Sequence, residues 1–450
     1  MSREMRHSGI EWIGEIPKEW KESKTLYVLS MPITDGPHTT PDLFDNGIPF
    51  ISADAVSDGF INFDNKRGFI SKSFYEECCK KYIPQRDDIY MIKSGASTGQ
   101  TAIVETDEIF TIWSPLAVFR ANKNIMIPRF LLYILRSEGY QKQVENNWSY
   151  GTQQNIGMRT LEGLIVSYPN IDEQQKIANY LDKVCGEVDE MIALQEQMIE
   201  ELKAYKQSVI TEAVTKGLRS AEGRLQGKNP DAPMRDSGID WIGEIPEGWK
   251  LGRIKNLCSI ISKGATPPTI DNEAYNGSVR FIKCENISGN KLVNNALYYI
   301  SSESNNSMKR SQLKENDILF VIAGATIGKT AIVTQDFLPS NTNQAVSFLR
   351  LQNKQYTNYL WYILQSQVIQ KPLWLNAVQS AQPNLSMEDL GNFDMPIPDE
   401  SEQRAIASYL DTKCSEIDSL IAIKQAKIEE LKEYKKSVIY EYVTGKKEVV

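Results

Sequence analysis

A glycine-rich loop that ends in Lys-Thr comes closest, among the segments of this chain, to a known chemistry. GATIGKT, residues 324–330, resembles the loop with which P-loop proteins hold nucleotide phosphates. That loop needs four residues between its first Gly and the Gly-Lys pair, and here there are three. The run that follows, AIVT, is typical of a strand and not of the required helix. The pattern therefore predicts a strand-loop-strand hairpin, with Lys329 as a candidate phosphate contact.

The sequence offers little for catalysis or for zinc binding. It contains only two histidines, His7 and His38, and six cysteines without a C-x-x-C spacing. It also lacks an H-E-x-x-H motif, a G-x-G-x-x-G motif after a strand, and the Asn-Pro-Pro-Tyr or Asp-Pro-Pro-Tyr tetrapeptide of amino-methyltransferases. We expect the acidic pair Asp87-Asp88 to be solvated turn residues, and Cys185 and Cys414 to be small buried hydrophobes. The composition is that of a binding protein with no metal and no catalytic residue of its own.

Polar side chains cluster in five loop-like segments: DGPHTTP (35–41), SYGTQQN (149–155), SKGATPP (262–268), SNTNQ (340–344) and QSAQPN (379–384). These residue types can hydrogen-bond to base edges or hold phosphates. For any single one of them the role of an ordinary polar loop residue is favoured, but their similar placement in both halves adds weight to a shared role. The candidates for DNA contact are His38, Thr39, Thr40, Lys93, Ser97, Gln100, Tyr150, Gln153, Gln154, Lys263, Thr266, Lys283, Lys329, Asn341, Asn343, Gln344, Gln379 and Gln382.

The net charge of -8 at first argues against a nucleic-acid partner, because duplex DNA is bound through cationic surface. Much of the excess acid, however, lies in the segments with helical periodicity. Residues 171–233 contain 8 basic and 12 acidic residues, whereas 234–398 contain 15 and 14. No apolar run is long enough to span a membrane, and the first residues lack the apolar stretch of a secretory signal, so we expect a cytoplasmic protein.

The chain is an internal duplication. Residues 5–21, MRHSGIEWIGEIPKEWK, match residues 234–250, MRDSGIDWIGEIPEGWK, at 13 of 17 positions, with a separation of 229. The ends of the halves match as well, since ELKAYKQSVITEAV at 201–214 corresponds to ELKEYKKSVIYEYV at 430–443. The interiors, such as 31–80 and 260–310, share little. A constant frame around two diverged interiors suggests two readers of different targets.

A long helix, or two in series, is predicted after Pro169, with an acidic first turn and with Gly186 as a possible bend. Its apolar residues keep a heptad spacing that recurs in the second half, and Lys206 and Lys435 interrupt this seam at matching places. About 30 residues of helix would span about 45 Å. The predicted helix-pair interface comprises Val188, Ile192, Ile199, Leu202, Val209, Ile417, Ile421, Ile428, Leu431 and Val438.

Short β-rich runs bounded by Gly, Pro, Asn and Asp fill the interior of each half, and an apolar helix, 129–137 or 358–366, closes each one. Residues 217–236 are polar and contain several Gly and Pro, which indicates a linker. The expected domains are 1–170, 171–233 with the linker, 234–398, and 399–450.

These frame motifs carry a resemblance over essentially the whole chain. SGIEWIGEIPKEW and SGIDWIGEIPEGW open the halves, QKIANYLD (175–182) and RAIASYLD (404–411) open the helical segments, and E-L-K-x-Y-K-x-S-V-I lies near each end. Together they resemble the specificity subunit of a type I restriction-modification enzyme. The resemblance implies an α+β fold with a pseudo-twofold internal repeat. Two mixed α/β target recognition domains, 1–170 and 234–398, would be separated by two long helices packed as an antiparallel coiled coil.

The resemblance also implies a function and partners. Each recognition domain would read one part of a bipartite site in double-stranded DNA. Two methyltransferase subunits that use S-adenosylmethionine, and restriction subunits that use ATP and Mg²⁺, would join the chain, which would itself bind no cofactor. No base-contacting residue can be transferred, because the recognition regions vary freely in the family.

Symmetry supports this interpretation independently. The strands of DNA are antiparallel, so two similar readers engage a duplex alike only when a twofold axis relates them. Two rival interpretations stay open at this stage. One is a non-catalytic coiled-coil scaffold without sequence-specific reading, and the other is a self-sufficient nuclease or methyltransferase.

Overall fold

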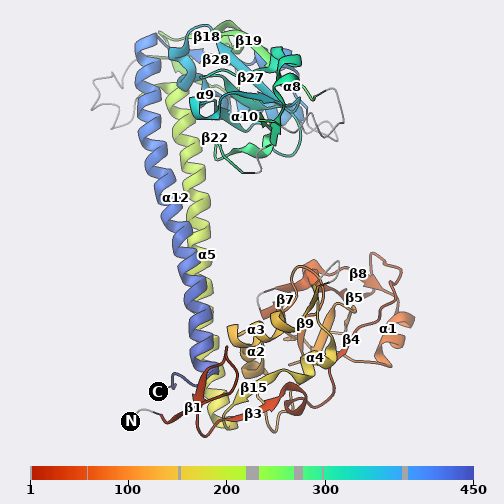
Figure 1. Cartoon of the computed structure of the whole chain (residues 1–450). Helices are drawn as coiled ribbons and strands as arrows, with labels where there is room; N and C mark the ends of the chain where they lie inside the picture. The colour runs from red at the N-terminus through yellow and green to blue at the C-terminus, as the bar shows by residue number, and fades with distance from the viewer. Residues whose placement is uncertain are drawn as a thin grey trace. The chain divides into compact units, whose positions relative to one another are not determined.

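The computed structural model describes residues 3–57, 59–150, 154–218, 233–267, 277–295, 298–377 and 384–449. The chain divides into two compact units (Figure 1). Unit 1 comprises Met1–Glu196 and Gln425–Val450, and unit 2 comprises Gln197–Lys424. Each unit therefore contains one of the expected recognition domains together with a part of both helical regions.

Unit 1 is built around a six-stranded sheet with a smaller sheet beside it, and the helices α1 to α4 that accompany its strands are short. The large sheet has the order β4 (Thr34–Asp35), β12 (Leu116–Phe119), β9 (Ile89–Ile92), β10 (Thr101–Ile103), β7 (Gly59–Ile61), β6 (Val56–Ser57). The second has the order β11 (Thr111–Ile112), β5 (Ile48–Ile51), β8 (Gly68–Ile70). The other strands pair as β1 (Met5–His7) with β2 (Glu15–Pro17), β3 (Lys21–Lys24) with β15 (Ile165–Tyr168), and β13 (Ser149–Tyr150) with β14 (Gln154–Asn155). The short helices are α1 (Lys72–Cys79), α2 (Pro128–Arg136), α3 (Glu138–Asn147) and α4 (Met158–Gly163).

Unit 2 repeats this plan, with fewer strands among its described residues. Its main sheet has the order β19 (Cys258–Lys263), β27 (Val346–Leu351), β24 (Ile318–Val321), β25 (Thr330–Ile332). The second has the order β23 (Tyr298–Ile300), β20 (Val279–Ile282), β26 (Ser340–Thr342). The remaining pairs are β16 (Met234–Asp236) with β17 (Glu244–Pro246), β18 (Lys250–Arg253) with β28 (Asp394–Ile397), and β21 (Ile287–Ser288) with β22 (Lys291–Leu292). The short helices are α7 (Ile254–Leu257), α8 (Ser302–Ser307), α9 (Thr357–Gln365), α10 (Gln367–Ala377) and α11 (Met387–Asn392).

The central strand β9 is buried on both faces, which explains its unbroken apolar sequence. Ile89 and Met91 join a core cluster with the buried side chains of α2, and Tyr90 and Ile92 join a cluster with the smaller sheet. Successive side chains of β9 point to opposite faces of the sheet, so this strand contributes to two hydrophobic clusters. The predicted apolar helices of both halves are confirmed as α2 and α9.

The two long helices are α5 (Ile171–Lys216, 46 residues) and α12 (Glu400–Val443, 44 residues). Both are longer than the roughly 30 residues predicted, and α5 continues through Gly186 without interruption. Asn170 and Asp399 cap their first turns, since their side-chain oxygens accept hydrogen bonds from the backbone N–H groups of Glu173 (3.0 Å) and Glu402 (2.9 Å). The acidic first turn of α5 is as predicted.

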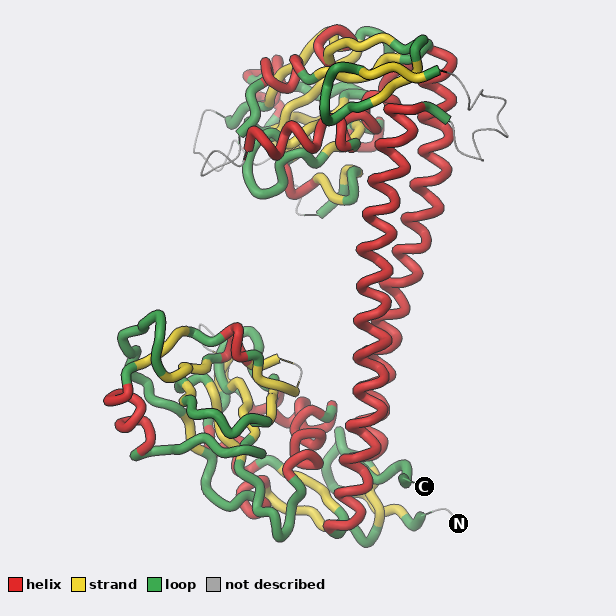
Figure 2. Tube along the Cα trace, turned by 180° about the vertical axis from the view of Figure 1, so that it is seen from behind, coloured by secondary structure: helices red, strands yellow, loops and turns green. Residues whose placement is uncertain are grey.

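The two helices lie side by side (Figure 2), and their contacts show that they pair in opposite directions within each unit. In unit 1, the N-terminal half of α5 meets the C-terminal half of α12, where Lys435 Nζ lies 2.7 Å from Asp189 Oδ1. In unit 2, the equivalent contact joins Lys206 Nζ to Asp418 Oδ1 at 2.6 Å. The two contacts are related by the 229-residue repeat with the roles of the helices exchanged, as in an isologous interface. All ten predicted interface residues are buried or half-buried.

Each unit's core is closed by the end of the other half's helix. In unit 1 the C-terminal end of α12 contributes Val438, Ile439, Tyr442 and Val443 to the main cluster. In unit 2 the C-terminal end of α5 contributes the equivalent Ile210, Ala213 and Val214. Full burial of a large apolar side chain stabilises by about 1.5–3 kcal/mol, so this exchange is a large part of each core.

The frame motif of each half packs against the same helix ends. The Tyr440 hydroxyl donates to the carbonyl of Ile13 (3.1 Å), and a Cβ at Gly445 would lie 2.5 Å from Pro17. In unit 2, a Cβ at Gly217 would lie 3.2 Å from the Trp249 ring. Both glycines have positive φ (68° and 72°) and follow the end of a long helix, where glycine is favoured.

Two expectations from the sequence were wrong. Asp88 is fully buried and not solvated, because the Arg120 guanidinium donates to both of its carboxylate oxygens, at 2.6 and 2.7 Å. Asp317 and Arg350 form the same pair in unit 2. The predicted linker 217–236 also extends too far, since Met234–Asp236 is strand β16. Most of that linker, 219–232, lies outside the described residues.

The ion pairs of the helix seam lead to a first prediction. Asp189→Lys should lower the free energy of unfolding by about 1 kcal/mol, because it places a second ammonium group beside the buried Lys435. Adding Lys435→Glu should recover most of that loss by reversing the pair. Urea unfolding of the full chain and its variants gives the double-mutant cycle, and the Lys206–Asp418 pair is the matched repeat. A double variant whose loss equals the sum of the two single losses would contradict the proposed coupling.

Candidate nucleic-acid interface

The polar candidates of unit 1 gather at one edge of its large sheet. Strands β4, β12, β9 and β10 are consecutively antiparallel, so the end of one strand lies beside the start of the next. Ala117 faces Asp35, Leu116 faces Ile92, and Thr101 faces Met91. The segments that follow or precede these residues form what we call the unit 1 loop edge. It carries His38, Thr39, Thr40, Lys93, Ser97 and Gln100.

Unit 2 has the equivalent loop edge. Lys263 faces Ser347, Val321 faces Val346, and Phe320 faces Thr330, which brings the ends of β19 and β24 beside the starts of β27 and β25. The parallel pair β20–β26 ends at the same place, since Ile282 faces Thr342. The unit 2 loop edge carries Lys263, Thr266, Lys283, Lys329, Asn343 and Gln344.

A further polar segment lies against each hairpin. In unit 1 the Gly95 N–H donates to the carbonyl of Gln154 (3.0 Å), and in unit 2 Ala323 forms a bridge with Asn384. The structure thus joins Gln154 to 95–101 and Asn384 to 324–330, which are distant in sequence. Tyr150 belongs to strand β13, and Gln153, Gln379 and Gln382 lie outside the described residues.

The two glycine-rich segments are hairpin loops, as predicted. Loop 93–100 joins β9 to β10 and loop 322–329 joins β24 to β25, so neither leads into the helix that a P-loop requires. The carbonyl of Gly99 accepts from the Gln141 side chain (2.9 Å), and that of Gly328 accepts from the equivalent Gln370 (3.0 Å). Residues 95–99 also have the G-x-S-x-G spacing of a hydrolase elbow, but that turn joins a strand to a helix.

Most of the candidate side chains are accessible. His38, Thr39, Thr40, Gln100, Lys263, Thr266, Lys329 and Gln344 are exposed, and Lys93, Ser97, Gln154, Lys283 and Asn343 are half-buried. Asn341 is the exception, because its side chain is fully buried. Its amide donates to Asn305 Oδ1 (2.9 Å) and to the Met308 carbonyl, and its oxygen accepts from the Thr342 N–H. Asn341 therefore holds the loop from inside and presents no atom to a ligand.

Charges at the unit 1 loop edge are largely neutralised within the unit. The Asp35 carboxylate, only 1% exposed, lies 3.2 Å from Lys93 Nζ and 3.3 Å from His38 Nε2, and it also pairs with Lys81. Burial alone would raise the pKa of Asp35, but the ammonium groups of Lys81 and Lys93 outweigh it and hold the pKa below its usual value. Lys93 is thus committed to a carboxylate.

The unit 2 loop edge keeps its positive charge. Lys263 and Lys329 are exposed and form no ion pair with another described residue. The Lys283 ammonium lies 3.2 Å from the centre of the Tyr298 ring, a cation–π contact that leaves its charge uncompensated by any carboxylate in the described residues. This edge can contact anionic groups at several points.

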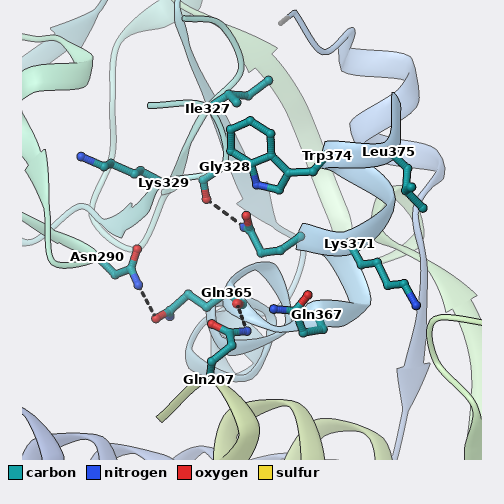
Figure 3. A pocket seen from close by; sticks show the side chains of 11 residues that line it. Gln207, Asn290, Ile327, Gly328, Lys329, Gln365, Gln367, Lys371, Trp374 and Leu375 are labelled. Atoms are coloured by element: carbon teal, nitrogen blue, oxygen red, sulfur yellow. Dashed lines mark hydrogen bonds between the residues drawn. The ribbon is translucent and has the colours of Figure 1, made fainter. Parts of the chain in front are cut away.

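A cleft of about 810 Å³ adjoins the hairpin loop of unit 2 (Figure 3). Amide side chains tie its walls together, since Gln207 of α5 donates to the carbonyl of Gln365 (2.8 Å) and Asn290 donates to the Gln365 side chain (2.7 Å). Lys371 and Trp374 of α10 also line it, and the sequence reasoning missed both. Their spacing from Gln367, at four and seven residues on one helix face, was the available signal.

No helix of the described residues is long and apolar enough to cross a membrane. Nor does any group of three His, Cys, Asp or Glu side chains in the described ranges gather as metal ligands would.

Comparison with known proteins gives a consistent result. A family model described as "Type I restriction modification DNA specificity domain" matches twice, at residues 17–204 and 246–433. A Methanocaldococcus jannaschii protein assigned as the MjaX type I restriction enzyme specificity subunit is 26% identical over 444 residues, which is 96% of this chain and 95% of that protein. The Escherichia coli EcoBI specificity subunit is 30% identical over 297 residues, covering 65% of this chain and 60% of that subunit. A solved chain from a study of assembly and conformational transition in the type I R-M system shares the fold, with a TM-score of 0.67 at 17% identity, over 95% of this chain and 98% of that one.

The hairpin glycines lead to a second prediction. Gly324 and Gly328 have nearly the same φ, 89° and 88°, but a Cβ at Gly324 meets open space, whereas one at Gly328 would lie 2.6 Å from the Gln370 side chain. Gly324→Ala should therefore cost only the backbone strain, about 1–2 kcal/mol. Gly328→Ala should cost roughly 1–3 kcal/mol more. Equal losses in urea unfolding would show that the Gln370 clamp does not constrain the loop.

Proposed function

Because the chain belongs to the type I restriction modification DNA specificity family, we propose that it is the DNA-reading subunit of a type I restriction-modification complex. Each half would read one part of a bipartite site in double-stranded DNA. The observation that carries the proposal is the pair of loop edges. The same sheet edge in both units gathers exposed hydrogen-bonding side chains, and the residues there differ between the units.

The chemistry of the loop edges fits two readers of different sequences. Asn, Gln, Ser, Thr and His side chains can bond to base edges in the major groove, while lysines fix the position of a protein through phosphates. Unit 1 offers Thr39, Thr40 and Gln100, and unit 2 offers Thr266, Gln344 and three lysines. The antiparallel strands that hold these loops are arranged alike in both units, so the two loop edges differ mainly in the residues that they present to DNA.

The reciprocal contacts of α5 and α12 support a spacing role for the helix pair. Antiparallel helices in a duplicated chain give each reader the same relation to its own DNA strand, as the twofold axis of a dimeric repressor does. We infer that the helix pair acts as a ruler that sets the distance between the two parts of the site.

The helices also offer a surface for partner subunits. Met191 and Leu194 of α5 are exposed, and so are the equivalent Leu420 and Ile423 of α12. Apolar side chains exposed at regular helical spacing indicate a protein interaction surface. We propose that two methyltransferase subunits bind there, one to each repeat, and that restriction subunits complete the complex. S-adenosylmethionine, ATP and Mg²⁺ would act in those partners, and this chain would be cytoplasmic and would not itself catalyse a step.

A coiled-coil scaffold that reads no DNA is the remaining alternative. It would need the helix pair but not the two diverged loop edges. Footprinting of the chain together with its methyltransferase partners distinguishes the two, since a scaffold leaves no sequence-specific protection on DNA.

Exchange of one recognition region gives a third prediction. Strands β18 and β28 pair with each other, Lys250 facing Ile397, so residues 250–397 enter and leave the unit at one place. Replacing this segment by that of a homologue should change one part of the selected DNA site and leave the other part and the spacer unaltered. Selection from random DNA by the reconstituted methyltransferase complex measures this. A change in both parts would contradict independent reading.

A fourth prediction tests the ruler. Seven residues inserted after Gln197 and another seven after Ala426 lengthen both helices at equivalent positions of the repeat, midway between the two seam ion pairs, and keep the heptad register. At about 1.5 Å per residue the added length is about 10 Å, or roughly three base pairs. The selected spacer should grow by about that amount with both recognised sequences retained.

The same insertion into α5 alone serves as the control. It makes the segment between the two seam ion pairs longer in α5 than in α12, so both pairs cannot form together, and it should lower stability without giving a new spacer. A matched double insertion that selects the original spacer would refute the ruler.

A further inference from the structure

The cleft of unit 2 differs from its counterpart in unit 1 more than the shared architecture requires. Both lie between a glycine hairpin loop, the corner of two short helices and the end of the other half's long helix. In unit 1 the lysines of this cleft are paired, Lys435 with Asp189, Lys436 with Glu433 at 2.7 Å, and Lys432 with Glu429 at 3.1 Å. Each of these three lysines is therefore balanced by a carboxylate within the protein.

The cleft of unit 2 has no such balance. Lys329 of the hairpin loop and Lys371 of α10 line it, and Figure 3 shows their side chains extending to opposite sides with Trp374 between them. Neither lysine forms an ion pair with another described residue. Helix α3 of unit 1, the equivalent of α10, differs in the pairing of its lysine. There the residue equivalent to Lys371 is Lys142, whose ammonium lies 3.9 Å from Glu138, and Gln367 replaces that glutamate in unit 2.

An aromatic side chain accompanies these lysines. Trp374 is 43% exposed and Leu375 is exposed beside it, on the helix that carries Lys371. The equivalent residues of unit 1 are Glu145 and Asn146, both exposed. Unit 1 thus presents the carboxylate of Glu145 where unit 2 presents the indole ring of Trp374, and a carboxylate repels phosphate.

The differences between the two clefts limit the kinds of ligand that the cleft of unit 2 could bind. A partner that binds both halves alike would need similar surfaces in both clefts, and these differ in charge and in apolar character. Lys329 and Lys371 can each contact a phosphate of a nucleic-acid strand, and the exposed indole of Trp374 can pack against one of its sugars or bases. Lys329 also belongs to the loop edge, so the cleft continues that surface.

We propose that this cleft holds the sugar–phosphate backbone of DNA flanking the part of the site read by unit 2. Lys329 and Lys371 contact phosphates, and Trp374 packs against the sugar or base between them. These contacts position the reader and strengthen binding without selecting a sequence. The proposal rests on the function proposed above, and it predicts a contact on one side of the bipartite site only.

The test measures how affinity for the selected site depends on salt, using the chain assembled with its methyltransferase partners. Each lost phosphate contact removes about 0.9 from the slope of log affinity against log salt concentration. The double variant Lys329→Gln/Lys371→Gln should therefore lower the slope by about 1.8 and the affinity at about 0.1 M salt by tens of fold. Trp374→Ala should weaken binding severalfold at an unchanged slope, and Trp374→Phe should retain most of it.

Hydroxyl-radical footprinting locates the contact. The double variant should lose backbone protection beside one part of the site, while its preference among altered sites stays as in the unchanged protein. Lys142→Gln is the matched control, because it removes the equivalent but paired lysine of unit 1, and it should leave slope and footprint unaltered.

The possible outcomes separate the two proposals. An unchanged slope and footprint in the double variant would overturn the cleft assignment, and so would a loss of methyltransferase binding with DNA contacts intact, which would make the cleft a protein-docking site. If the unchanged protein shows no sequence-specific footprint, the proposed function itself fails.

Discussion

The antiparallel pairing of α5 with α12 is the interaction on which the rest of the structure depends. It does more than bury an apolar seam, because the C-terminal end of each helix also completes the core of the unit that begins the other half. Val438, Ile439 and Val443 are as much a part of unit 1 as its own strands are. Neither half of the duplicated sequence contains a whole core, so the two halves must fold together.

This exchange explains why the frame and the interiors diverged differently. The SGI-x-WIGEIP segment packs on the helix end supplied by the other half, as Tyr440 shows by its bond to Ile13. A change on one side of that contact must be matched on the other, whereas most of the candidate side chains at the loop edges are exposed. Two DNA readers on one scaffold require residues that can vary at the loop edges and residues that stay the same in both halves at the helix ends.

The sequence alone predicted the elements better than their partners. Heptad spacing selected ten residues for the seam, all of which are buried or half-buried, and the spacing of GATIGKT favoured a hairpin over a phosphate loop. Periodicity shows which face of a helix is buried but not which unit buries it, so the exchange of helix ends was beyond its reach. The predictions that Asp88 is solvated and that Asn341 contacts DNA were wrong for a related reason. A polar loop residue can be buried when a residue distant in sequence forms hydrogen bonds with it, as Arg120 does with Asp88. Trp374 was missed because an aromatic residue at helical spacing usually indicates core.

The exchange of helix ends can be tested most directly by removing one of them. A chain that ends at Tyr434 lacks Val438, Ile439, Tyr442 and Val443, and hydrogen exchange reports which part of the protein then opens. Our account predicts that unit 1, including β15 and the first turns of α5, loses protection although the deletion lies more than 200 residues away in sequence from these segments. Residues 233–424 of unit 2 should keep theirs. Full protection of residues 3–196 in the shortened chain would contradict the account.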